Sequence, residues 1–200
     1  MNAPQPINSR TVASGVQKMT PSEAFVETMV AQGVDTLFGI MGSAFMDAMD
    51  IFAPAGIRLI PVVHEQGAGH AASGYAHATG KVGVASTTCG PGFTQIMTAL
   101  TIAARGNVPL VVFAGDSPIA AAWYLQQIDM APLALACGAH YVAVKHLDRL
   151  LDNVREAFLV AQNEQRPVVL SVPMDLQKQA WPHLADYTPS SDLLPVAQRP

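Results

Sequence analysis

The stretch that decides the fold runs from Ile57 to Gly80 and reads IRLIPVVHEQGAGHAASGYAHATG. Its opening part, 57–63, is almost continuously apolar, which is typical of a strand that is buried on both faces. The residues from Glu65 to Thr79 are mostly small and predict a long helix that starts where the strand ends. A buried strand that leads directly into a helix is the repeating unit of a parallel sheet.

The same alternation continues on both sides of this stretch. Upstream, Thr20-Pro-Ser-Glu23 is a capping box that predicts the start of a helix, and Gly33 predicts its end. The other predicted elements are an apolar run at 36–40, helices at 44–52, 92–105, 130–137 and 147–158, and strands at 82–88, 108–114, 140–144 and 168–172. We therefore predict a doubly wound α/β fold, with a mainly parallel sheet of about six strands and helices on both faces.

The chain is expected to form one folded domain with flexible ends. Residues 20–181 carry the alternating pattern and form the predicted domain, whereas residues 1–19 are polar and turn-rich. After the last predicted strand the periodicity is lost, and prolines recur at Pro182, Pro189, Pro195 and Pro200. We interpret residues 182–200 as a linker to a central domain that lies outside this sequence.

Composition argues against several classes of function. The net charge of −4 comes from 15 acidic and 11 basic residues and includes no basic run, so we expect no nucleic-acid partner. The sequence has neither an apolar stretch of about eighteen residues nor an apolar signal core near its start, so we expect a cytoplasmic protein without a membrane span. The two cysteines, Cys89 and Cys137, are expected to be buried, reduced thiols.

Three glycine-rich loops follow predicted strands and are the candidate ligand loops. They are Phe38-Gly-Ile-Met-Gly-Ser43, His64-Glu-Gln-Gly-Ala-Gly69 and Thr88-Cys-Gly-Pro-Gly-Phe-Thr-Gln95. Ligands of open α/β sheets bind beyond the carboxyl ends of the strands, which is where these loops are expected. Each loop taken alone is also a common α/β turn, and Glu65 taken alone is an acid that favours the positive end of a helix.

Two other kinds of ligand suit this region less well. His64, His70 and His77 lie close in sequence but lack a metal-binding spacing, so we expect structural histidines and no metal site. Gly67-Ala-Gly-His-Ala-Ala72 matches the dinucleotide pattern G-x-G-x-x-A, but the next strand ends in Ser86-Thr-Thr-Cys89 without the acidic residue that binds a ribose. A dinucleotide-binding domain is therefore a weaker alternative.

The motifs become specific when they are taken in order. The run from His64 to Gly80 is followed by Gly90-Pro-Gly-Phe-Thr-Gln95 and then by Pro109-Leu-Val-Val-Phe-Ala-Gly115. This order resembles the N-terminal, pyrimidine-binding domain of thiamine-diphosphate enzymes of the acetolactate-synthase type, and Phe38-Gly-Ile-Met-Gly-Ser-Ala-Phe-Met46 is most similar to the sulfoacetaldehyde acetyltransferase branch. The resemblance implies one half of an enzyme that cleaves or forms C–C bonds of 2-oxo acids or related carbonyl compounds.

The resemblance also implies roles for individual residues. In that family a glutamate hydrogen-bonds the N1′ atom of the thiamine diphosphate aminopyrimidine, and Glu65 is the matching catalytic residue. Gln126 matches a glutamine that reaches into the active site, although a solvent-exposed loop amide is an equally good interpretation. The matching cofactor-binding positions are Met41 and Gly42, where the family usually has Pro-Gly, then Thr88, Gly90 and Pro91, and Gln95 in place of a frequent asparagine.

The resemblance further implies what this sequence does not supply. The family holds the cofactor diphosphate through Mg²⁺ on a Gly-Asp-Gly motif of a C-terminal domain, and the nearest run here, Gly115-Asp-Ser117, ends in serine. The isolated chain is therefore expected to be inactive without central and C-terminal domains or a partner subunit. Active sites between two chains imply a homodimer or homotetramer. The alternative is a non-catalytic, stand-alone or split-subunit module for binding or assembly.

Overall fold

The computed structural model describes residues 20–40, 42, 46–179 and 187–193. Its six strands form one sheet in the order β2-β1-β3-β4-β6-β5, and all neighbouring strands in it are parallel. The strands are β1 (Thr36–Gly39), β2 (Arg58–Pro61), β3 (Gly83–Thr87), β4 (Leu110–Asp116), β5 (His140–Ala143) and β6 (Pro167–Pro173).

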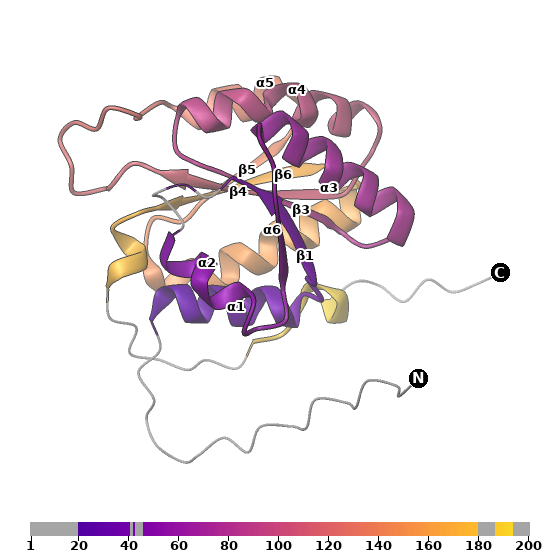
Figure 1. The fold of residues 1–200 in the computed structure, drawn as a ribbon, viewed down its shortest axis with the longest axis horizontal. Coiled ribbons are helices and arrows are strands. Elements are labelled where there is room, and N and C mark those ends of the chain that lie inside the picture. The colour runs from indigo at the N-terminus through magenta and orange to yellow at the C-terminus, as the bar shows by residue number, and fades with distance from the viewer. Residues whose placement is uncertain (1–19, 41, 43–45, 180–186, 194–200) are drawn as a thin grey trace, which may run out of the picture.

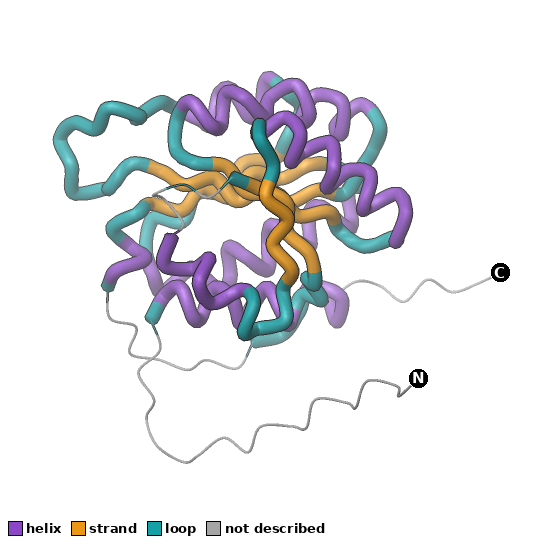
Figure 2. The backbone as a smooth tube through the Cα atoms, in the orientation of Figure 1, coloured by secondary structure: helices purple, strands orange, loops and turns teal. Residues whose placement is uncertain are grey.

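Helices cover both faces of this sheet. The α-helices are α1 (Pro21–Ala31), α2 (Met46–Phe52), α3 (Glu65–Thr79), α4 (Pro91–Arg105), α5 (Met130–Ala136) and α6 (Leu150–Glu164), and the short 3₁₀ helices are η1 (Leu147–Arg149), η2 (Leu176–Lys178) and η3 (Ser190–Leu193). In Figure 1, α3, α4 and α5 lie on one side of the sheet and α1, α2 and α6 on the other. Figure 2 shows the strands sandwiched between the two helical layers. The predicted doubly wound α/β fold is confirmed. The expectation that 57–63 is a strand buried on both faces is wrong, because β2 lies at the edge of the sheet, its residues are half-buried or exposed, and Val63 is exposed.

The central strands are apolar throughout because each faces two cores. Along β4, Val111 and Phe113 belong to the core that α1, α2 and α6 cover. Val112 and Ala114 alternate with them and belong to the core under α3, α4 and α5. A strand that is covered on both sides has no solvent face, so its sequence shows no polar alternation.

Helix α3 is rich in small residues because two other elements approach it closely. A Cβ atom built on Gly69 would lie 2.5 Å from the Cβ of Ala99 on α4. On the sheet side, a Cβ atom on Gly83 of β3 would lie 2.2 Å from the carbonyl oxygen of Ala72. Both contacts need a hydrogen in place of a side chain, so these glycines set how closely α3, α4 and β3 pack.

The first helix begins as its sequence predicts. Thr20 Oγ1 accepts a hydrogen bond from the backbone N–H of Glu23 at 3.2 Å, and Glu23 Oε2 accepts one from the backbone N–H of Thr20 at 2.7 Å. This reciprocal capping box satisfies two of the free N–H groups of the first turn. The helix ends at Ala31, followed by Gly33 at φ +78°.

Part of the predicted linker lies against the domain. Within 182–200, the described residues are 187–193, and Ser190 is fully buried. Ser190 Oγ lies 2.5 Å from Oε1 of Gln32, the residue that caps α1, and 2.9 Å from Oε1 of Gln162 on α6. Tyr187 adds a hydrogen bond from Gln32 Nε2 to its hydroxyl, and its ring lies under the Arg155 guanidinium at 5.3 Å. The predicted flexible segment 1–19 lies outside the described residues.

Within the described ranges, none of the helices combines the length and the apolar character that a membrane crossing requires.

Candidate functional site

The strand order places a topological switch point next to β1, the kind of position at which open α/β sheets bind their ligands. From β1 the chain passes through α2 on one face to reach β2, and it then returns through α3 on the opposite face to reach β3. The connection after β1 leads to β2 on one side, whereas the connection after β3 leads to β4 on the other side. The carboxyl ends of β1 and β3 therefore form a topological switch point. Gly42 and Thr88 lie in the segments that follow β1 and β3, and Glu65, the first residue of α3, lies shortly after the end of β2.

Glu65 is the first residue of α3 and is buried, with 8% of its surface exposed. The helix starts here because the Nδ1 atom of His64 caps it, accepting a hydrogen bond from the backbone N–H of Gln66 at 3.2 Å. The helix dipole favours a negative charge at this end. Among the described residues, none forms a hydrogen bond or ion pair with the Glu65 carboxylate. A buried carboxyl group without a partner favours a ligand that supplies one.

Gly92 and Gly42 form the floor beside this carboxylate. A Cβ atom on Gly92 would lie 2.9 Å from Glu65 Oε1 and 2.8 Å from Thr87 Oγ1. A Cβ atom on Gly42 would lie 2.7 Å from both the Cβ and the Oγ1 of Thr88. Neither position has room for a side chain, so the segment after β1 packs directly against Thr88, and the start of α4 packs directly against Glu65 and Thr87.

The loop after β3 also meets the segment that follows β4. Gly90 adopts φ +59°, and a Cβ atom there would lie 1.9 Å from the carbonyl oxygen of Gln126. The same carbonyl oxygen accepts a hydrogen bond from Cys89 Sγ at 3.3 Å. Only glycine tolerates both this backbone conformation and this approach, so Gly90 and Cys89 hold the backbone of Gln126 against the loop after β3.

The segment 117–129 that carries Gln126 projects beyond the sheet, at the left in Figure 1. Near its start, Asp175 accepts hydrogen bonds from the backbone N–H groups of Ile119 and Ala120, both at 3.1 Å. Near its end, the Tyr124 hydroxyl donates to Gln126 Oε1 at 3.3 Å. Gln126 is consequently half-buried rather than solvent-exposed.

The other sequence-predicted positions lie as follows. Pro91 is the first residue of α4, and Gln95 lies on the exposed side of the same helix. Met41 lies outside the described residues, and its contact with the cofactor stays a prediction. Contacts therefore join Gly42 to Thr88 and Gly90 to Gln126, with Glu65 against Gly92 between them. Sequence reasoning gave no role to Gly92, Cys89 or Tyr124.

Cys89 is a buried thiol within this loop. It is 1% exposed, and burial together with the nearby charge of Asp116 raises its pKa from 9.0 to about 11. The thiol therefore stays protonated at neutral pH and keeps its S–H available as a donor.

A second, open cleft lies along the same edge of the sheet, beyond the ends of β4, β5 and β6. Asp116 lines it and is engaged within the fold, accepting from Ser171 Oγ at 2.6 Å and from the backbone N–H of Ser117 at 2.7 Å. Lys145 and His146 stand exposed at its rim. The carboxylate of the predicted Gly115-Asp-Ser117 run thus serves to join β4 to β6.

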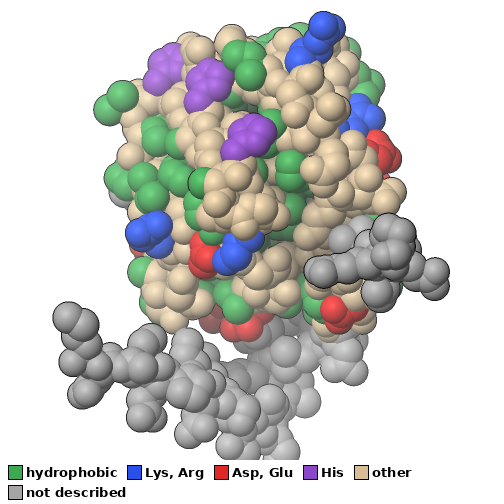
Figure 3. All heavy atoms as spheres, turned by 90° about the vertical axis from the view of Figure 1, so that its right-hand side faces the viewer, with side chains coloured by type: hydrophobic (Ala, Val, Ile, Leu, Met, Phe, Trp, Pro, Cys, Tyr) green, Lys and Arg blue, Asp and Glu red, His purple; other side chains and the backbone are tan. Residues whose placement is uncertain are grey.

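The exposed histidines of α3 do not converge. His64 caps its own helix, and the Nε2 atom of His70 lies 3.5 Å from Gln66 Nε2. Histidine side chains are visible on the face drawn in Figure 3, among hydrophobic side chains and the backbone and other uncharged side chains drawn in tan. Over the described part of the chain, no three His, Cys, Asp or Glu side chains are arranged to hold a metal ion.

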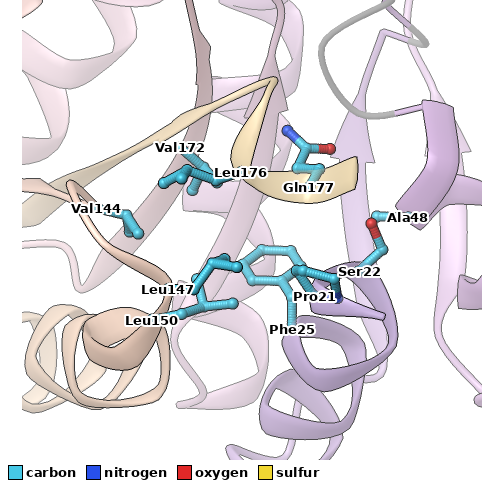
Figure 4. A pocket seen from close by; sticks show the side chains of 10 residues that line it. All are labelled: Pro21, Ser22, Phe25, Ala48, Val144, Leu147, Leu150, Val172, Leu176 and Gln177. Carbon is cyan, nitrogen blue, oxygen red and sulfur yellow. The ribbon is translucent and has the colours of Figure 1, made fainter. Parts of the chain in front are cut away.

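An enclosed apolar void lies elsewhere, between α1, η2 and the start of α6 (Figure 4). Its lining includes Phe25, Leu150 and Leu176, whose side chains point toward one another. Its volume of about 10 Å³ leaves room for no more than one water molecule. Glu65 and the loops around it do not line this void, so we interpret it as a packing defect of the core rather than a ligand site.

Comparison with known proteins gives a family match. The family described as thiamine pyrophosphate enzyme, N-terminal TPP binding domain, matches residues 19–133. Glu65, Gly42, Thr88, Gly92 and Gln126 all lie within these limits.

Individual relatives extend the similarity beyond the matched region. Sulfoacetaldehyde acetyltransferase from Castellaniella defragrans is 47% identical over 171 residues, which cover 84% of this chain and 28% of the relative. The acetolactate synthase isozyme 2 large subunit from Escherichia coli K12 is 38% identical over 162 residues, which cover 80% of this chain and 30% of the relative. The mitochondrial acetolactate synthase catalytic subunit from Saccharomyces cerevisiae is 36% identical over 79% of this chain and 24% of its own length. The chain thus spans less than a third of each relative.

Proposed function

This chain belongs to the thiamine pyrophosphate enzymes, of which it contains the N-terminal TPP binding domain, and from this membership we propose that the aminopyrimidine of thiamine diphosphate binds beside Glu65. The observation that carries the proposal is the buried Glu65 carboxylate, which has no partner among the described residues and lies at a topological switch point. The proposed enzyme cleaves or forms a C–C bond in a small carbonyl compound.

The residues around Glu65 fit a flat heterocycle. Gly92 and Gly42 let the segments after β3 and β1 pack directly against Glu65 and Thr88. We propose that the planar ring lies against this closely packed surface. Thr88 and Gly90 continue this surface along the second loop. In the proposal, Met41, Pro91 and Gln95 complete the contacts with the cofactor.

Glu65 has the position and the chemistry to act on the ring. A carboxyl group can donate to or accept from a ring nitrogen, and burial strengthens such a hydrogen bond by excluding competing water. We propose that Glu65 holds a proton between its carboxyl oxygen and the pyrimidine N1′ atom. When bound, the cofactor supplies a carbon nucleophile and accepts the electron pair released by C–C cleavage. Gln126 is proposed to contact the substrate.

The remaining parts of the site are proposed to lie outside these 200 residues. The chain covers 28% of the sulfoacetaldehyde acetyltransferase and 30% of the bacterial acetolactate synthase subunit. We propose that Mg²⁺ and the cofactor diphosphate are held by a further domain, in the same polypeptide or in a partner subunit, and that the assembly is at least a dimer.

The names of the relatives suggest which substrates to test first. Two sulfoacetaldehyde acetyltransferases are 47% and 45% identical to this chain, whereas the acetolactate synthase subunit of Escherichia coli is 38% identical. We propose sulfoacetaldehyde as the first candidate substrate and pyruvate as the second.

The test uses the complete protein that contains this domain, loaded with thiamine diphosphate and Mg²⁺. Substrate consumption and product formation are measured with sulfoacetaldehyde, pyruvate, oxalyl-CoA and benzoylformate, with and without the cofactor. Cofactor-dependent product that disappears in Glu65→Gln is the expected result. A complete protein that binds no thiamine diphosphate, or that turns over equally well without it, would contradict the proposal and favour a non-catalytic assembly module.

A further inference from the structure

The loop 88–90, between β3 and α4, holds the backbone of Gln126 at its carbonyl group. Cys89 Sγ donates to this oxygen at 3.3 Å, and the α-carbon of Gly90 is so close that a Cβ atom would lie 1.9 Å from it. The Gln126 carbonyl oxygen has little freedom to shift, because it is hydrogen-bonded to Cys89 and packed against Gly90. The position of Gln126 is therefore tied to the loop that also borders Glu65.

Tyr124 holds the side chain of the same residue. Its hydroxyl donates to Gln126 Oε1 at 3.3 Å and lies 3.9 Å from Met174 Sδ, at the end of β6. With the amide oxygen occupied, the NH₂ group of Gln126 is the end that remains available, and no described residue accepts from it. The carboxamide is thus presented as a hydrogen-bond donor.

We infer that Cys89 and Tyr124 are positioning residues that hold Gln126 at its backbone and at its side chain, so that its amide NH₂ donates to an oxygen of the bound substrate. The ligand chemistry that suits this donor is a carbonyl oxygen or the oxyanion of a carboxylate or sulfonate. This inference rests on the proposed function, because it presupposes a substrate beside Glu65.

The surroundings of the two residues support a fixed rather than an adaptable contact. Cys89 is 1% exposed, so water does not compete for its S–H. Asp175 secures Ile119 and Ala120 at the other end of the segment with two hydrogen bonds of 3.1 Å. The intervening residues include Trp123, which is 74% exposed, so the fixed part of the segment is at its two ends, and Gln126 lies in one of them.

The first measurement concerns the position of the segment and needs no activity. Amide hydrogen exchange of residues 124–128 is compared in the complete protein and in the variants Cys89→Ala, Cys89→Ser and Tyr124→Phe. Loss of one hydrogen bond should accelerate exchange about fivefold in Cys89→Ala and in Tyr124→Phe. Cys89→Ser, which keeps a donor, should exchange nearly as wild type. Cys137→Ala is the matched control, because this second buried thiol is the C-cap of α5 and does not contact Gln126 in the described structure.

The second measurement separates positioning from a general structural role. Cys89→Ala and Tyr124→Phe should each lower kcat/KM about fivefold for the carbonyl substrate, with the Kd of thiamine diphosphate unchanged. In a Gln126→Ala background the same substitutions should have no further effect, because the residue through which they act is gone.

Three outcomes would overturn the inference. They are unchanged exchange in both variants, effects on kcat/KM that add to that of Gln126→Ala, and losses that follow cofactor affinity instead of substrate turnover. Failure of the proposed function looks different, because Glu65→Gln would then behave as wild type or the complete protein would bind no cofactor. In that case the hydrogen-exchange result still decides whether Cys89 and Tyr124 hold Gln126. The proposed role of the Gln126 NH₂ group as a donor to substrate would be wrong.

Discussion

The Glu65 carboxylate lies so close to Gly92 that a Cβ atom on Gly92 would be 2.9 Å from Glu65 Oε1. The contact joins the first turn of α3 to the first turn of α4. Two helices that start at the same end of a parallel sheet thus place a buried acid against bare backbone. The size of residue 92 consequently controls the space next to the proposed catalytic group.

Gly92→Ala is therefore expected to impair cofactor binding. The added methyl group would lie 2.6 Å from Thr88 Cγ2, 2.8 Å from Thr87 Oγ1 and 2.9 Å from Glu65 Oε1, so these side chains must shift. We expect the Kd of thiamine diphosphate to rise at least about tenfold and the protein to lose about 1–3 kcal/mol of stability from overpacking. Isothermal titration of the complete protein and urea unfolding measure the two effects.

Gly74→Ala is the matched control for this substitution. Gly74 is an exposed residue of α3, and nothing lies within 4 Å of a Cβ atom built there. Because alanine favours a helix interior, the control should gain about 0.5–1 kcal/mol and bind the cofactor as wild type. Equal cofactor affinity in Gly92→Ala and Gly74→Ala would show that residue 92 does not border the binding site.

Both thiols should be slow to react in the folded protein. Cys89 and Cys137 are buried, and the pKa of Cys89 is raised to about 11, so little thiolate forms near neutral pH. Alkylation followed by mass spectrometry should find both cysteines unmodified in native protein and both modified after denaturation. Labelling of native Cys89 at the rate of a free thiol would mean that its loop does not enclose it.

Asp35 should contribute stability that depends on pH. Its carboxylate is bound by Lys81 Nζ and by the Tyr75 hydroxyl, each at 2.5 Å, and these bonds lower its pKa from 3.8 to about 2. A carboxyl group with a lowered folded-state pKa stabilises the fold above its unfolded pKa and loses that effect as the pH falls through the folded value.

The test measures the melting temperatures of wild type and of Asp35→Asn from about pH 6 down to about pH 2. The difference should be fully present at about pH 6 and should shrink between about pH 4 and pH 2. The Asp35–Lys81 pair is about half-exposed. The stability difference should therefore amount to no more than about 1 kcal/mol and should diminish in high salt. A difference that grows as the pH falls would contradict the assignment.

Gln32 should anchor the residues that follow the domain. Its Oε1 accepts from the backbone N–H of Ser190 at 3.2 Å and lies 2.5 Å from Ser190 Oγ, which is fully buried. Gln32→Ala leaves these groups without that partner and should cost about 1–3 kcal/mol in urea unfolding. Asn163→Ala, which removes an exposed amide from α6, should cost nothing. A Gln32→Ala variant as stable as this control would show that 187–193 is not held there.

The sheet could be predicted from sequence because burial on two faces leaves a strong signal. Strands β4 and β6 are apolar except for Asp116 and Ser171, since alternate residues enter different cores. Thr20 and Glu23 marked the start of α1 because a capping box depends only on local spacing. Interactions confined to a few consecutive residues, or repeated along a whole strand, are those that a single sequence reveals.

The contacts around Gln126 could not be predicted in the same way. They depend on the path of the segment 117–129, which has no periodicity, and on a carbonyl group that any residue would supply. Nothing in the local sequence distinguishes Cys89 from a simple buried thiol, or Gly92 from other turn glycines. The proline-rich composition after Trp181 likewise suggested a spacer, and gave no sign that Ser190 would be buried against α1 and α6.

Glu65 is proposed to exchange a proton with the cofactor's aminopyrimidine, and the proposed catalytic function of the site depends on this exchange. The most direct test is the rate at which bound thiamine diphosphate exchanges its C2 hydrogen for deuterium, measured by quenched-flow NMR in the complete protein. Glu65→Gln should slow this exchange by at least about 100-fold while the cofactor stays bound. Glu27→Gln, which alters an exposed carboxyl group on α1, should leave it unchanged. Exchange at the wild-type rate in cofactor-loaded Glu65→Gln would contradict the account.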